Sequence, residues 1–218
     1  QALKDLVNGD NSNISAQNTA VGYQALGTTT KSTGATAIGY KALFACTGDS
    51  CSGQNTAVGA NALSSLTVHY HNTAIGFNAM ANTTSGFRST AVGHNALANN
   101  VLGQDNTAVG AFALESNNGG DSAWSFNVAV GTSALNLSNG SSGNTAVGYW
   151  AAKVHESSTA ITAIGYKALA ANTTGAGNTA SGYEALTANT TGNYNTAIGY
   201  QALNANTIGA DNTAVGYV

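Results

Sequence analysis

The stretch Asn195-Thr196-Ala197-Ile198-Gly199-Tyr200-Gln201-Ala202-Leu203 recurs in near-copies, twelve in all, along this chain of 218 residues. Nine of the eleven intervals between the central glycines are 17 residues long, so the two longer ones, of 20 and 21 residues, contain insertions. Self-similarity at a short fixed period is typical of a solenoid, in which each repeat packs only against its neighbours. The structural repeat glycines are Gly22, Gly39, Gly59, Gly76, Gly93, Gly110, Gly131, Gly148, Gly165, Gly182, Gly199 and Gly216.

A repeat of 17 residues is too short for two helices, and its Thr, Val, Ile and Tyr residues favour strands. Two short strands and two turns fit this length, so we predict an all-β fold, a parallel β-solenoid of about twelve 17-residue coils. With coils about 4.8 Å apart, the stack would be a rod about 58 Å long. The turns tend toward Asn-Thr-Thr-Gly, as at residues 172–175, and we expect their glycine to supply a positive φ.

The residues around each glycine divide between two faces of a strand. Alanine stands two before the glycine in all twelve copies, and Val or Ile stands directly before it in eleven. Because side chains alternate along a strand, Ala20 shares the face of the glycine, while Thr19, Val21 and Tyr23 share the other. We favour the register with the small face inside, which directs Val and Ile outward for identical copies to cover. The alternative register buries Val and Ile and makes a self-sufficient monomer.

The repeat covers nearly everything, so we expect one β-solenoid domain over 1–218, with loop insertions at 4–17, 44–53 and 116–124. The latter two fall in the same turn of the repeat and should project from one side of the rod. Cys46 and Cys51 lie in the first of them, and we predict a disulfide between them in an oxidising, extracellular setting. Two free thiols in a reducing compartment are the alternative.

The composition argues against several classes of partner. Only 7% of the residues are charged and the formal net charge is -3, so no basic patch is available for nucleic acid or for anionic lipid. No apolar run approaches the roughly 18–20 residues of a membrane span, so we expect no membrane insertion. The chain contains no proline, which suits coils that must all donate backbone hydrogen bonds.

The residues that carry chemistry form no convincing site. His69 and His71 flank Tyr70 with a spacing that can hold a metal, but no third ligand is evident, and solvent-facing turn histidines explain them better. Acidic residues are scattered, with no pair at one position of the repeat, so the sequence contains no candidate site for acid–base catalysis. We therefore predict no catalytic residue, no metal, no cofactor and no enzyme activity.

The Asn-Thr-Ala-Val-Gly and Asn-Thr-Ala-Ile-Gly repeats resemble the head repeats of trimeric autotransporter adhesins, the YadA-like family. They also resemble the β-roll repeats of some phage tail fibres. The resemblance extends over almost the whole chain, although the 17-residue period is longer than that of the family repeats. It implies a left-handed parallel β-roll, usually a homotrimer, that acts as an extracellular adhesive or display rod.

We therefore expect a secreted or cell-surface structural protein: a subunit of an extracellular fibre or filament, adhesive in some settings, built by self-association. Its partners would be identical subunits, stacked head to tail or as a lateral trimer, and in addition a surface receptor or glycan. The chain begins and ends at the same phase of the repeat, two residues after the repeat glycine, which makes its ends the predicted self-assembly ends. Boundaries cut from a longer repeat protein explain the same ends. The residues are Gln1, Ala2, Leu3, Val215, Gly216, Tyr217 and Val218.

Two alternative functions belong to the class of binding modules. One is a receptor-binding segment of a phage tail fibre. The other is an ice-binding solenoid, because Thr19, Thr36, Thr56 and their successors form a regular ladder of hydroxyl and methyl groups. The bulky Tyr residues beside this ladder argue against ice binding, which needs a flat face.

Overall fold

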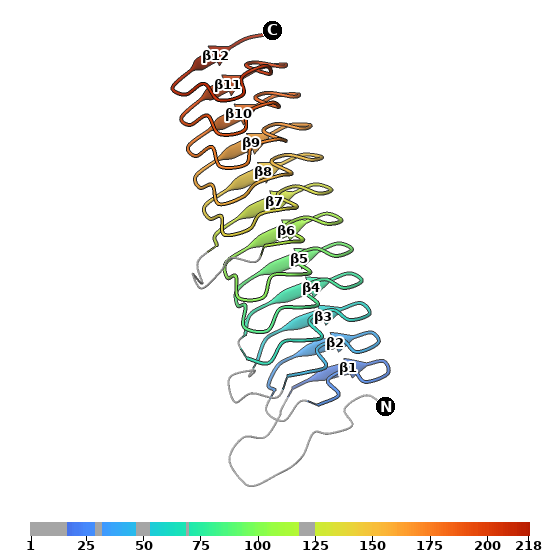
Figure 1. The fold of residues 1–218 in the computed structure, drawn as a ribbon. Helices are drawn as coiled ribbons and strands as arrows, with labels where there is room; N and C mark the ends of the chain where they lie inside the picture. Colours follow the sequence, from blue (N-terminus) through green and yellow to red (C-terminus); the bar gives the residue numbers. More distant parts are fainter. Residues whose placement is uncertain (1–16, 29–31, 47–52, 69, 118–124) are drawn as a thin grey trace.

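The computed structural model describes residues 17–28, 32–46, 53–68, 70–117 and 125–218. In these ranges twelve strands form one parallel sheet in chain order, and the chain winds into a β-solenoid of about eleven turns (Figure 1). The described ranges contain no helix that is long and apolar enough to cross a membrane. The predicted all-β fold and the parallel solenoid are confirmed. The strands are β1 Thr19–Val21, β2 Thr36–Ile38, β3 Thr56–Val58, β4 Thr73–Ile75, β5 Thr90–Val92, β6 Thr107–Val109, β7 Val128–Val130, β8 Thr145–Val147, β9 Thr162–Ile164, β10 Thr179–Ser181, β11 Thr196–Ile198 and β12 Thr213–Val215.

The strands stack in register, so that each residue pairs with its equivalent in the next coil. Between β3 and β4, for example, Thr56 pairs with Thr73 and Ala57 with Ala74. The register continues across the longest interval, where Ala108 of β6 pairs with Ala129 of β7. Each repeat position therefore becomes a column of side chains that runs along the rod.

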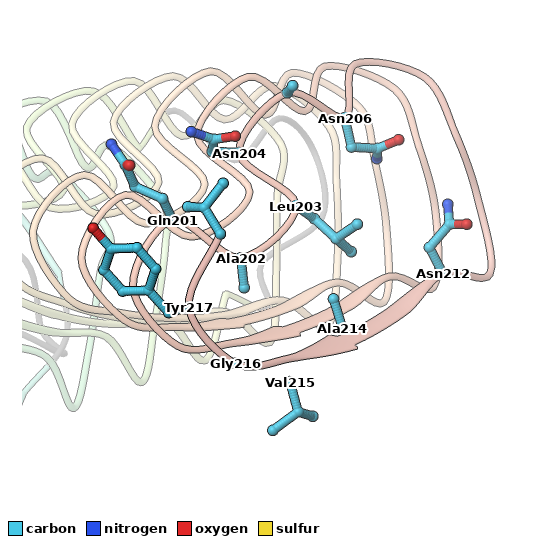
Figure 2. A pocket seen from close by; sticks show the side chains of 12 residues that line it. Gln201, Ala202, Leu203, Asn204, Asn206, Asn212, Ala214, Val215, Gly216 and Tyr217 are labelled. Carbon is cyan, nitrogen blue, oxygen red and sulfur yellow. The ribbon is translucent and has the colours of Figure 1, made fainter.

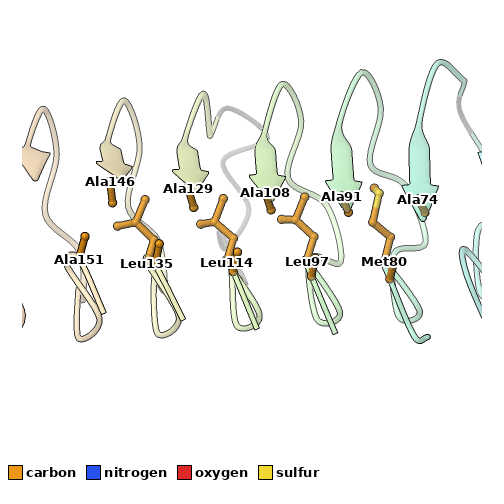
Figure 3. Packing of buried hydrophobic residues seen from close by; sticks show 14 of the residues in the cluster. Ala74, Met80, Ala91, Leu97, Ala108, Leu114, Ala129, Leu135, Ala146 and Ala151 are labelled. Carbon is orange, nitrogen blue, oxygen red and sulfur yellow. The ribbon is translucent and has the colours of Figure 1, made fainter. Parts of the chain in front are cut away.

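The middle alanine of each strand points into the solenoid, which confirms the register with the small face inside. All the alanines from Ala37 to Ala197 in this column are fully buried. They face a column of leucines from the opposite wall, such as Leu97 and Leu114, with Met80 at the same position in one coil (Figure 3). The alternative register is wrong, because the Val and Ile residues of the same strands are on the outside.

Within the described residues, the second strand predicted for each coil does not form. The opposite wall consists of turns in which the second and fourth residues after the repeat glycine have left-handed backbone angles, as in Gln24 (φ 55°) and Leu26 (φ 52°). This wall still bonds from coil to coil, since the Leu26 amide donates to the Ala42 carbonyl at 3.0 Å. A strand would send consecutive side chains to opposite faces. The turn instead buries two consecutive residues, Ala25 and Leu26, completely.

The turn glycines of the Asn-Thr-Thr-Gly segments also differ from the prediction. Gly175 does not have the positive φ that we expected, and the left-handed position falls two residues later, at Gly177 (φ 66°). Gly175 is needed instead for space, because a Cβ there would lie 2.4 Å from the Gly192 carbonyl oxygen and 2.6 Å from Oδ1 of Asn172. Close packing between coils, rather than backbone conformation, explains this glycine.

Candidate interaction surfaces

The first candidate surface is the strand face, which we define as the outward side chains of the first and third residues of β1–β12. In these strands only Thr, Val, Ile and one Ser occupy the two columns, so the face carries no charge. The threonines are partly exposed, and central residues of the other column, such as Val147 and Ile164, remain 37% and 43% exposed. The result is a regular, uncharged strip of methyl and hydroxyl groups along the whole sheet.

An aromatic column follows the repeat glycines. In the last five coils it consists of tyrosines whose rings stack with centroids 5.0–5.5 Å apart and planes within 11° of parallel. Partial burial in this stack raises the pKa of Tyr183, and the neighbouring Glu184 carboxylate adds to the effect. Val215 and Tyr217, on either side of Gly216, point to different sides of the chain (Figure 2). The aromatic column therefore lies beside the strand face and not on it.

Two columns of buried asparagines support the walls. In the first, directly before the strands, Oδ1 of Asn178 accepts the backbone N–H of Asn195 at 2.9 Å, and its Nδ2 donates to the Gly192 carbonyl at 2.7 Å. In the second, in the turns, Nδ2 of Asn189 donates to Oδ1 of Asn172 at 2.8 Å. These bonds satisfy buried backbone groups that no strand covers. Sequence reasoning read such asparagines as turn residues and missed both ladders.

His155 replaces asparagine in the turn ladder and is fully buried. The Ser158 hydroxyl lies 2.8 Å from its Nε2, and Nδ2 of Asn172 lies 3.3 Å from its Nδ1. Burial lowers the pKa of His155 to about 4, and the hydrogen bonds with Asn172 and Ser158 oppose that shift only in part. The imidazole is therefore neutral at neutral pH and acts as a structural link between coils.

The second candidate surface, the corner patch, lies at the turn that leads into β4–β7. Arg88 and Asp105 form a two-point ion pair, with Nε to Oδ1 at 2.8 Å and Nη2 to Oδ2 at 2.7 Å. The Arg88 guanidinium also lies 4.7 Å from the centre of the Phe87 ring. The sequence analysis missed this cluster, although the separation of 17 residues between Arg88 and Asp105 was a signal that could have found the ion pair. The patch comprises Tyr70, His71, Phe87, Arg88, Asp105 and Phe126.

A pocket of about 500 Å³ lies at the end of the last coil (Figure 2). Ala202, Leu203 and Ala214 line it, together with the predicted self-assembly residues Val215–Val218. In earlier coils the next coil covers the equivalent alanines and leucines completely, as at Ala185 and Leu186. The pocket is therefore the uncovered cross-section of the solenoid interior rather than a specialised ligand site.

The remaining predicted residues fall in several places. Gln1, Ala2, Leu3, Cys51 and His69 lie outside the described residues, as does most of each predicted insertion. Cys46 is buried, and its disulfide with Cys51 stays a prediction.

The structure brings the other histidines to separate sites. His71 forms a hydrogen bond with Gln54, and His94 stacks on Phe77 with ring centroids 5.5 Å apart. Among the described residues, no group of three or more His, Cys, Asp or Glu side chains could hold a metal ion. Comparison with protein-family models, curated proteins and solved structures yields no match.

Proposed function

We propose that this chain is a rod-shaped structural segment of an extracellular fibre, and that identical chains associate side by side through the strand face. The observation that carries the proposal is the Val and Ile column, most of whose inner members stay about two fifths exposed, as at Ile75 and Ile164. Soluble proteins rarely leave a row of aliphatic side chains of this length uncovered. Covering it with a second copy removes it from water.

The dimensions of the strip fit an interface between copies. Twelve strands of three residues make a strip roughly 58 Å by 10 Å, or about 600 Å². A standard interface buries about 800 Å² on each partner, so a modest contribution from flanking residues completes it. The resemblance to YadA-like heads and tail-fibre repeats suggests three chains, each using this face, with an adhesive or display role for the resulting fibre.

The experiment introduces two lysines on the strand face, Val109→Lys and Val147→Lys, which lie on strands separated by β7. Their side chains are 38% and 37% exposed, so a single coil stack tolerates them. The matched control places lysines two coils apart on the exposed turn positions Ser157 and Thr191. Light scattering should give a multiple of the 21.6 kDa chain mass for the parent and the control, and one chain mass for the strand-face variant. A parent protein with the mass of one chain at all concentrations would contradict the proposal.

Ice binding is the second candidate, favoured by one observation. The Thr and Val/Ile columns lie side by side in register on the strand face, and Tyr217 points to a different side of the chain from Val215, so its ring does not obstruct that face (Figure 2). Thermal hysteresis from a preparation that light scattering shows to be single chains would favour this candidate. Hysteresis should then be lost in the Val109→Lys, Val147→Lys variant.

A further inference from the structure

The corner patch is built on a backbone position where the fold does not require large side chains. His71, Arg88, Asp105 and Phe126 have φ between 44° and 63°, in the left-handed region. The equivalent residues in two later coils are glycines with the same conformation: Gly143 and Gly177, with φ of 68° and 66°. A residue with a Cβ is less stable there than in its preferred conformation. Residues with a side chain also occupy this left-handed position in other coils, as at Gln54 and Tyr194, so the patch is distinguished by the contacts among its side chains rather than by backbone strain.

The side chains of the patch hold one another in place. The Arg88–Asp105 pair joins two coils, and the Phe87 ring supports the guanidinium from one side. The Tyr70 ring lies 6.2 Å from that of Phe87 and meets the His71 ring edge-on at 4.6 Å. A surface that is already ordered loses little conformational entropy when it binds a ligand.

The charges of the patch cancel within it. Arg88 and Asp105 neutralise each other, but the pair uses only two of the five guanidinium N–H donors and two of the carboxylate lone pairs. The unused donors and acceptors lie in two adjacent planar groups, an arrangement that suits neighbouring hydroxyl groups on one ligand. Tyr70 and Phe126, which are 41% and 49% exposed, add apolar ring surface. Planar polar groups beside exposed rings match the hydroxyl rim and the C–H face of a sugar.

We propose that the corner patch binds a neutral oligosaccharide. From Tyr70 to Phe126 the patch extends over three coil spacings, about 14 Å, which is longer than one sugar ring. A protein partner would need a surface of about 20–30 residues, and six side chains are too few. The site lies at the turn before the strands, and sugar binding there does not depend on association through the strand face.

The experiment measures saturation-transfer NMR between the intact chain and four neutral trisaccharides: maltotriose, cellotriose, chitotriose and mannotriose. A sialylated trisaccharide serves as the charged comparison. At least one neutral trisaccharide should receive saturation from aromatic protons, and the sialylated one should receive less. No transfer to any neutral trisaccharide, or stronger transfer to the sialylated one, would overturn the proposal.

Two variants locate the site. Phe126→Gly installs the residue that Gly143 and Gly177 show to be compatible with this corner, so the coil should fold. It should weaken binding of the trisaccharide at least tenfold. Tyr194→Gly is the matched control, since Tyr194 has φ of 55° at the same position in a later coil and is 67% exposed. Equal affinities of the two variants would place the binding elsewhere.

Discussion

Acidification should destabilise this solenoid through one residue, His155. Its pKa falls from the ordinary 6.5 to about 4 because the side chain is fully buried in the turn ladder. Between these two values the unfolded chain binds a proton that the folded chain does not, so stability must decrease as pH falls through this range. The difference of 2.5 pH units between the two pKa values corresponds to about 3 kcal/mol of folding stability. This stability is fully present above pH 6.5 and fully lost below pH 4.

The perturbation is His155→Asn, which places in this coil the residue found in the next coils at Asn172 and Asn189. Urea denaturation followed by circular dichroism at pH 7.5 and pH 4.5 gives the loss of stability for each protein. The parent should lose about 2–3 kcal/mol more than the variant over this interval, because carboxylates that titrate in both proteins cancel in the comparison. Equal losses would refute the assignment of the acid sensitivity to a buried neutral imidazole.

Three other perturbations test the packing and the covalent structure. Gly110→Ala should cost about 3 kcal/mol or more of folding stability, because φ is +134° and the new Cβ would lie 2.6 Å from the Gly131 backbone. The control Gly143→Ala, where a Cβ meets nothing within 4 Å, should cost about 1 kcal/mol. Equal denaturation midpoints of the two variants would contradict close packing between the repeat glycines. Asn178→Ala should cost about 2–5 kcal/mol in the same assay, because it leaves the buried backbone N–H of Asn195 without its partner and removes a hydrogen bond to the buried Gly192 carbonyl. A cost below about 1 kcal/mol would show that water replaces the side chain. Thiol titration of the denatured, unreduced chain should find neither Cys46 nor Cys51 free, and two reactive thiols would exclude the disulfide.

The strand wall could be predicted from the sequence because its signals are local. Thr-Ala-Val-Gly has the alternation of a strand, and the 17-residue period fixes which residues are neighbours in the stack. Alanine at the middle position also identified the buried face, since no larger side chain occurs there in any coil.

The opposite wall could not be predicted in the same way. Its turns depend on left-handed backbone angles at residues such as Lys41 and Leu43, whose types do not favour that conformation. Contacts between coils hold these residues in place: the Lys41 amide donates to the Tyr23 carbonyl at 2.9 Å. The backbone conformation of this wall is therefore determined by interactions between repeats. The sequence of a single repeat does not show them.

The candidate surfaces were predictable to different degrees. The outward Val and Ile column follows from the strand register, and so could be proposed from the sequence as an interface. The Arg88–Asp105 pair could also have been predicted, because a separation of 17 residues, one repeat period, makes the two residues neighbours in the stack. The period does not show that the rings of Phe87 and Tyr70 lie against this pair and one another, which depends on the geometry of the corner.

Small-angle X-ray scattering of the intact chain over a concentration series tests side-by-side association most directly, because it measures mass and length together. A single coil stack is about 58 Å long and has a mass of 21.6 kDa. Side-by-side association predicts a mass that is a whole-number multiple of this value, a larger cross-section and an unchanged length. A mass of one chain at every concentration, or a length that grows in proportion to mass, would contradict association through the strand face.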